Sequence, residues 1–165
     1  MKMHTELVTG SGVRDTLGVS GIPGPLFERI ARALKVVLAA DGQLHPAEIN
    51  AYLDTCRSYG APDAMLDELR DFDPAGITLE SCFEGVAPDS IPVRALLYDA
   101  IRIAKADGSF AKNERAAVRR AADVLGIDQD EMMHIVALVD AEDAMRALRF
   151  SILCPPGLQS MAAAG

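Results

Sequence analysis

Two short segments of the chain carry acidic residues at the same spacing around an Asp-Gly pair. The segments are AADGQLHPAE in the first half and KADGSFAKNE in the second. In each, an aspartate comes directly before the glycine, and a glutamate follows the glycine by six residues: Asp41 with Glu48, and Asp107 with Glu114. Carboxylates near a glycine are typical of calcium loops, and they also occur in turns between helices. The pattern therefore raises two interpretations, a divalent-cation site and a helical turn.

Comparison with an EF-hand loop separates these interpretations. Such a loop places oxygen ligands at positions 1, 3, 5, 7, 9 and 12 and glycine at position 6. With Gly42 and Gly108 at position 6, the second half of the pattern is present in both segments. The first half is missing, because positions 1 and 3 are apolar in the first segment and are Ile103 and Lys105 in the second. Calcium needs about six oxygens, so neither segment is a complete EF-hand loop.

The same residues have structural roles in a turn. Glycine ends one helix in the left-handed conformation, and the glutamate in the first turn of the next helix can bond to its cap residue. We favour this interpretation for each segment taken singly. A joint metal site stays open: if the two turns meet, their carboxylates would be pooled around one divalent cation, calcium or a similar ion. The pooled ligands would be Asp41, Glu48, Asp107 and Glu114, with His45 as a further candidate.

Both segments belong to a longer internal repeat with an offset of 66 residues. Gly60 and Gly126 match at this offset, and so do apolar residues at the i, i+3, i+4, i+7 spacing of a helix with one buried face. Each copy therefore predicts three helices. The expected ranges are about 26–39, 46–59 and 63–71 in the first copy and 91–105, 112–125 and 129–139 in the second, with a short connector helix near 79–86 and a separate C-terminal helix beyond Asp140.

Length and composition favour one all-α domain. The 165 residues are enough to bury a core without disulfides or metal, and the chain lacks Trp and alternating strand-like runs. We predict a compact helical domain at 25–154, made of two pseudo-symmetric three-helix units with connector and C-terminal helices. Repeated glycines predict a flexible arm at 1–24, and the small residues after the last prolines predict a tail at 155–165.

The net charge of the chain and the sequence motifs that it lacks disfavour several classes of function. Lys and Arg number 16 against 24 Asp and Glu, for a net charge of -8, which disfavours nucleic acid and anionic membranes as partners. No apolar run is long enough for membrane insertion, so we expect a cytoplasmic protein whose partner is another protein. The three cysteines form no CxxC pair, and no nucleophile–base, P-loop or HExxH motif is present. We therefore expect no enzymatic activity.

The repeated segments also resemble a known family. IAKADGSFAKNERAAVRRAADVLGID and its weaker copy VLAADGQLHPAEINAYLDTCRSYGAP look like the TerB-like domain of bacterial tellurite-resistance proteins, which is similar to the N-terminal domain of the DjlA co-chaperone. The resemblance covers about residues 26–152. It implies an all-helical fold with internal pseudo-symmetry and a non-enzymatic role in stress response or protein assembly. Divalent-cation binding through acidic residues is one option that it leaves open, the other being an interaction or scaffold domain without metal.

Overall fold

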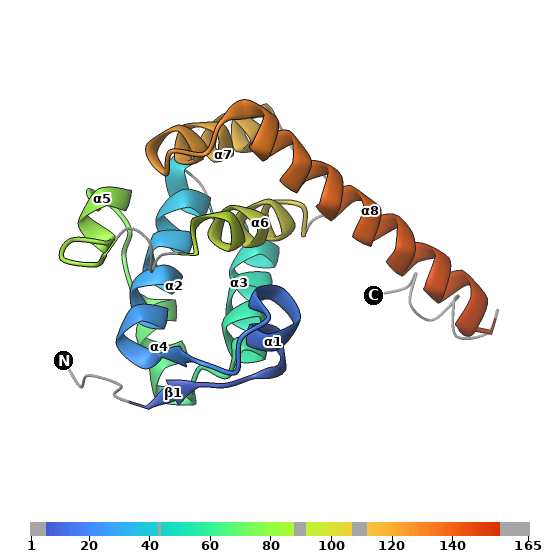
Figure 1. Ribbon diagram of the computed structural model, residues 1–165, viewed down its shortest axis with the longest axis horizontal. Helices are drawn as coiled ribbons and strands as arrows, with labels where there is room; N and C mark the ends of the chain where they lie inside the picture. The colour runs from blue at the N-terminus through green and yellow to red at the C-terminus, as the bar shows by residue number, and fades with distance from the viewer. Residues whose placement is uncertain (1–5, 43, 88–91, 107–111, 156–165) are drawn as a thin grey trace.

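The computed structural model describes residues 6–42, 44–87, 92–106 and 112–155. Within these ranges the regular secondary structure is helical apart from two strands of two residues each, which confirms the predicted all-α fold (Figure 1). In chain order the elements are β1 Leu7–Val8, α1 Ser11–Leu17, β2 Ile22–Pro23, α2 Gly24–Leu38, the 3₁₀ turn η1 Ala39–Asp41, α3 Pro46–Tyr59, α4 Asp63–Asp71, α5 Leu79–Cys82, α6 Val93–Ala104, α7 Lys112–Val124 and α8 Gln129–Leu153. Helices α2, α3 and α4 form the first predicted unit, α6, α7 and α8 form the second, and α5 connects them.

The centre of the core is formed by the first helix of each unit, α2 and α6, which pack against each other. Their apolar residues recur at helical spacing and are buried, as Leu34 and Leu97 illustrate. Ala33 and Ala100 are fully buried within the same helices, and small residues such as these let neighbouring elements approach closely. No helix in the described ranges is both long enough and apolar enough to cross a membrane.

The segment predicted to be a flexible arm is packed on the core instead, so this expectation is wrong for residues 6–24. Strands β1 and β2 pair antiparallel, with Val8 opposite Ile22, and Val13 of α1 is fully buried. The glycines that suggested flexibility allow a close approach to the end of α3. A Cβ on Gly10 would lie 2.2 Å from the Ser58 carbonyl oxygen, a distance that only glycine permits. Residues 1–5, and residues 156–165 of the predicted tail, lie outside the described ranges.

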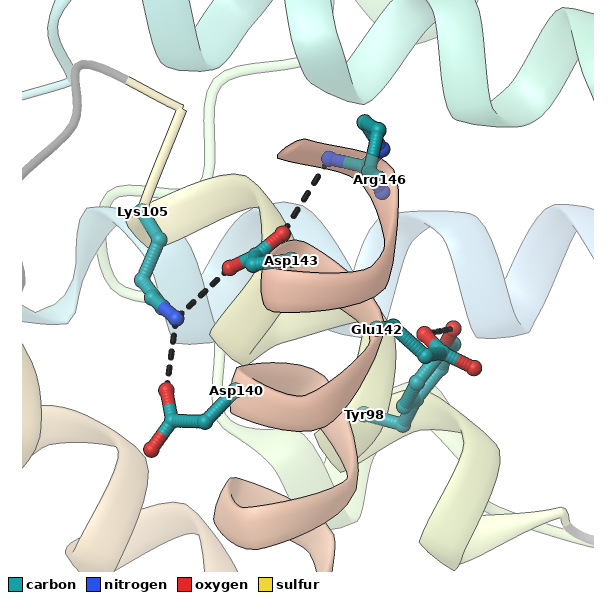
Figure 2. Close-up of polar contacts among 6 residues, drawn as sticks. All are labelled: Tyr98, Lys105, Asp140, Glu142, Asp143 and Arg146. Atoms are coloured by element: carbon teal, nitrogen blue, oxygen red, sulfur yellow. Dashed lines mark hydrogen bonds and ion pairs between the residues drawn. The ribbon is translucent and has the colours of Figure 1, made fainter. Parts of the chain in front are cut away.

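Helix α8 is one continuous helix rather than the predicted pair at 129–139 and beyond Asp140. No glycine or proline interrupts it, and the side chain of Asp140 forms an ion pair with Lys105, the residue that follows α6. The Lys105 Nζ lies 2.7 Å from Asp140 Oδ1 and 2.7 Å from Asp143 Oδ2 (Figure 2). These two bonds raise the pKa of Lys105. The Tyr98 hydroxyl donates to Glu142 Oε2 on the same stretch of α8, so α6 holds the middle of the long helix.

Lys35 is a buried cation on α2, with 6% of its surface exposed. Its Nζ donates hydrogen bonds of 2.7 to 2.9 Å to three backbone carbonyls at the end of α4, where a helix leaves such groups without partners of its own. The acceptors are the carbonyl oxygens of Leu69, Arg70 and Phe72. Burial lowers the pKa of Lys35, while the nearby charges of Asp71 and Asp73 raise it. This contact ties α2 to α4 within the first unit.

Asp99 is a buried carboxyl on α6 that connects the two units. The Tyr59 hydroxyl, at the end of α3, donates a 2.6 Å hydrogen bond to Asp99 Oδ2, and Arg102 lies 3.4 Å from Oδ1. Burial raises the pKa of Asp99 to about 6, against the opposing effects of Tyr59 and Arg102. The charged form of this carboxyl is therefore costly in the folded state.

This carboxyl should make stability depend on pH. Because the pKa of Asp99 in the fold exceeds the roughly 3.9 of an unfolded chain, its stabilisation is complete below about pH 4 and is lost as the pH rises through 6. Relative to Asp99→Asn, which cannot titrate, the wild-type free energy of unfolding should fall by roughly 2 to 3 kcal/mol between pH 4 and pH 7. Urea unfolding across this range measures the difference. Asp67→Asn, at an exposed site, is the control. If the difference in unfolding free energy between the wild type and Asp99→Asn stayed constant across this pH range, it would contradict the raised pKa of Asp99.

Candidate functional site: the paired acidic turns

The first acidic turn joins α2 to α3 through η1. Gly42 follows η1 with φ at 93°, in the left-handed region that favours glycine. His45 is the N-cap of α3, and its Nδ1 accepts a 3.2 Å hydrogen bond from the Ala47 amide. Glu48 completes a capping box, because its Oε2 accepts a 2.8 Å hydrogen bond from the His45 amide. The predicted structural role of Glu48 is confirmed.

The second turn joins α6 to α7, and residues 107–111 within it lie outside the described part of the chain. Glu114 is described and stands in the first turn of α7, the position that corresponds to Glu48 in α3. Its side chain is half-buried, whereas only 5% of Glu48 is exposed. The two units therefore place one glutamate each at the start of their second helix.

These two glutamates line the same cavity. It has a volume of about 10 Å³ and is surrounded by the ends of α2 and α6 and the beginnings of α3 and α7. This volume is close to that of one water-sized sphere. Its lining consists of Val37, Leu38, Glu48, Ala104, Glu114, Ala117 and Val118. The repeat thus brings Glu48 and Glu114 together although 66 residues separate them in the sequence.

The structure describes the other predicted metal ligands only in part. Asp41 ends η1 beside Gly42, but its side chain, like the whole of Asp107, lies outside what the structure describes. His45 is exposed, and its Nδ1 is used in the helix cap. Among the described residues, no group of three or more His, Cys, Asp or Glu side chains is arranged to hold a metal ion. The described part of the site is therefore one pair of glutamates.

A basic surface on α7 lies next to the first turn. Arg120 reaches the Ala40 carbonyl oxygen of η1 at 3.5 Å, the long end of hydrogen-bonding distance, and Arg119 donates a 3.0 Å bond to Gln129. Both side chains are exposed. Contacts of this kind are typical of a solvated helix face, and they position α7 over the turn of the other unit.

The two buried cysteines do not form a nucleophilic site. Cys56 and Cys82 are buried, and burial raises the pKa of both thiols, that of Cys56 to about 12. A reactive cysteine needs the opposite, a lowered pKa that supplies thiolate near neutral pH. His134 on α8 is exposed, and His4 lies outside the described ranges.

Sequence reasoning missed three polar residues that organise the fold around the turns. Lys35 and Asp99 lie on faces that are otherwise apolar, and Lys105 lies at the end of α6. A charged residue within an apolar helical stripe was the available signal, since such a residue is rarely buried without partners. The partners themselves come from distant parts of the chain, so the sequence did not indicate them.

Comparison with known proteins agrees with this architecture. Residues 90–137, which span α6, α7 and the beginning of α8, match the family model of the tellurite resistance protein TerB. The crystal structure of a tellurite resistance protein from Nostoc punctiforme has a similar fold, with a TM-score of 0.79, 26% sequence identity, and coverage of 87% of this chain and 89% of that chain. No curated protein matches the sequence. The fold class is thus an all-helical domain built from two related units, and the resemblance of the chain to the TerB-like family is confirmed.

Replacing Glu48 should reveal which property of its side chain holds the turn. Glu48→Gln keeps an acceptor for the His45 amide, so we expect a loss below about 0.5 kcal/mol, whereas Glu48→Ala removes the cap and should cost about 1 to 2 kcal/mol. Thermal and urea unfolding of the two variants provide the comparison. Equal losses in both would mean that the charge, rather than the hydrogen bond, stabilises the turn.

Proposed function

We propose that this chain is a TerB-like binding module without catalytic activity, and that its paired acidic turns bind one divalent cation in a stress-response setting related to tellurite resistance. The observation that carries the proposal is the cavity shared by Glu48 and Glu114. The resemblance to the TerB-like family and the name of the Nostoc punctiforme relative support the setting.

The chemistry of the residues is suited to a hard cation. Calcium and similar ions prefer carboxylate and carbonyl oxygens, and two glutamates are among the residues that line this small cavity. Asp41 and Asp107 precede the glycines of the two turns and would supply the further carboxylates. A bound ion at this place would link the starts of α3 and α7, and hence the two units.

The proposal predicts stabilisation by divalent cations. At a calcium concentration about ten times the dissociation constant, binding contributes roughly 1.4 kcal/mol, which for a chain of this size raises the melting temperature by roughly 3 to 6 °C. Calcium, magnesium and manganese are titrated separately into metal-free protein. In Glu48→Gln/Glu114→Gln and in Asp41→Asn/Asp107→Asn we expect the shift to fall by more than half.

The matched control is Glu84→Gln/Asp123→Asn, which removes two negative charges at exposed sites away from the turns. It should keep the full shift. An absent shift at millimolar metal, or an equal shift in all four proteins, would overturn the cation site.

A second candidate function is a protein-interaction or scaffold domain that needs no metal. The observation in its favour is the apolar surface of α8, where Leu148 and Ile152 are exposed by 52% and 70%. If the titration shows no binding of a divalent cation, the module would act through this surface alone.

A further inference from the structure

The C-terminal half of α8 is an exposed helix with an apolar face. In the described part of the chain, seven of the eleven exposed large hydrophobic side chains lie on α8, and every residue of 144–153 is exposed. Figure 1 shows this half of the helix extending away from the other helices. Monomeric proteins rarely leave a contiguous apolar surface in water. This half of α8 is therefore suited to contact with a partner.

Four of these seven exposed residues, together with Ala141, follow the spacing of a coiled-coil seam, whereas Met133, Phe150 and Leu153 lie outside it. The five residues recur along α8 at alternating intervals of three and four residues, which are the a and d positions of a heptad. We define the α8 seam as Leu138, Ala141, Met145, Leu148 and Ile152. Its four large members are exposed by 51% to 70%. A second helix that packed along the seam would bury them.

The seam faces away from the rest of the molecule. Val139, which is 1% exposed, marks the side of α8 that packs on the core, and Met145 lies six residues further, roughly 120° around the helix. A partner helix can therefore lie along the seam without displacing α6. The bonds of Lys105 to Asp140 and Asp143 hold the middle of α8 against the core, so the seam is presented in a defined orientation (Figure 2).

We propose that the α8 seam binds the α8 seam of a second copy of this chain in antiparallel orientation. With Met145 opposite Leu148 of the second copy, Ala141 falls opposite Ile152, and a two-fold axis between them makes the contact self-complementary. This inference goes beyond the proposed function and does not depend on the cation.

Charge complementarity favours a second copy of this chain as the partner of the seam, and it favours the antiparallel orientation. Glu142 and Arg149 occupy the e positions beside the seam, and in the antiparallel register they lie about 3 Å apart along the helix axis, close enough to pair between copies. Tyr98 uses only Oε2 of Glu142 and fixes its carboxylate in place. A parallel pair would instead put Ala137 and Ala144, the g residues, opposite these charges.

A groove beside the seam extends the contact. It has a volume of about 510 Å³ and lies between α1, α6 and α8, with Leu17, Val93 and Ile135 among its walls. In the antiparallel register the last turn of the second copy's α8 ends next to Ala141 and Leu138, at the rim of this groove. A seam about 20 Å long with this groove is at the small end of stable interfaces, so we expect a micromolar dissociation constant.

Sedimentation velocity of the full chain from about 1 to 300 µM, with reductant and EDTA, tests the dimer. The mass should rise from 17.6 kDa toward twice that value as the concentration increases. Met145→Glu and Leu148→Glu should each raise the dissociation constant roughly 100-fold or more, because each dimer loses two buried side chains and gains two buried charges. Because EDTA removes divalent cations, this test of the dimer does not depend on whether the proposed cation site exists.

The matched control is Met133→Glu, a substitution of the same type on the same helix at similar exposure, 52% against 56% for Met145, but outside the seam. It should dimerise like the wild type. A monomer at all concentrations, or equal weakening in all three variants, would overturn the proposal.

Disulfide trapping tests the direction of the helices. In a Cys154→Ser background, Ala141→Cys and Ile152→Cys chains should cross-link when mixed, because these positions face each other in the antiparallel register. Ile152→Cys alone should not cross-link efficiently, since its two copies lie roughly 16 Å apart along the axis. Efficient cross-linking of Ile152→Cys alone, or none in the mixture, would contradict the antiparallel seam.

Discussion

The packing of α2 against α6 is the constraint on which the rest of this structure depends. Each is the most apolar helix of its unit, and the two helices pack against each other. Once they pack together, the starts of α3 and α7 lie near each other, and Glu48 and Glu114 line one cavity. The acidic pair is thus a consequence of core packing. For Glu48 the local chemistry is that of helix capping, because its carboxylate accepts a hydrogen bond from the His45 amide.

Buried polar groups break the symmetry between the two units. The position that corresponds to Lys35 is Ile101, and the one that corresponds to Asp99 is Ala33, so each polar group is present in only one copy. Lys35 satisfies carbonyls at the end of α4, and Asp99 accepts the Tyr59 hydroxyl from the other unit. Because each must find its partner in the low-dielectric interior, these contacts favour one arrangement of the units over alternatives.

The proposed cation site and the α8 seam lie in different parts of the fold and depend on different interactions. The starts of α3 and α7 combine two glutamates with a small cavity, which supports the proposed cation site. The outer half of α8 combines apolar residues with an accessible face, and its chemistry suits another helix. The match to the TerB family model ends at residue 137, before all of the seam residues. The seam therefore belongs to a part of this chain that the matched segment does not include.

The sequence by itself determined the helices from α2 to the first part of α8, because apolar spacing, helix caps and terminating glycines act locally along the chain. It predicted neither α1 nor the continuation of α8 past Asp140 as one helix. It also identified the repeat and its four acidic residues, and it indicated correctly that Glu48 bonds to the cap residue of the next helix. Only the tertiary structure decided which of these residues meet. The closeness of Glu48 to Glu114, the partners of Lys35 and Asp99 and the docking of residues 6–24 all depend on contacts between distant segments. Local patterns do not encode such contacts, since packing selects them only after the helices have formed.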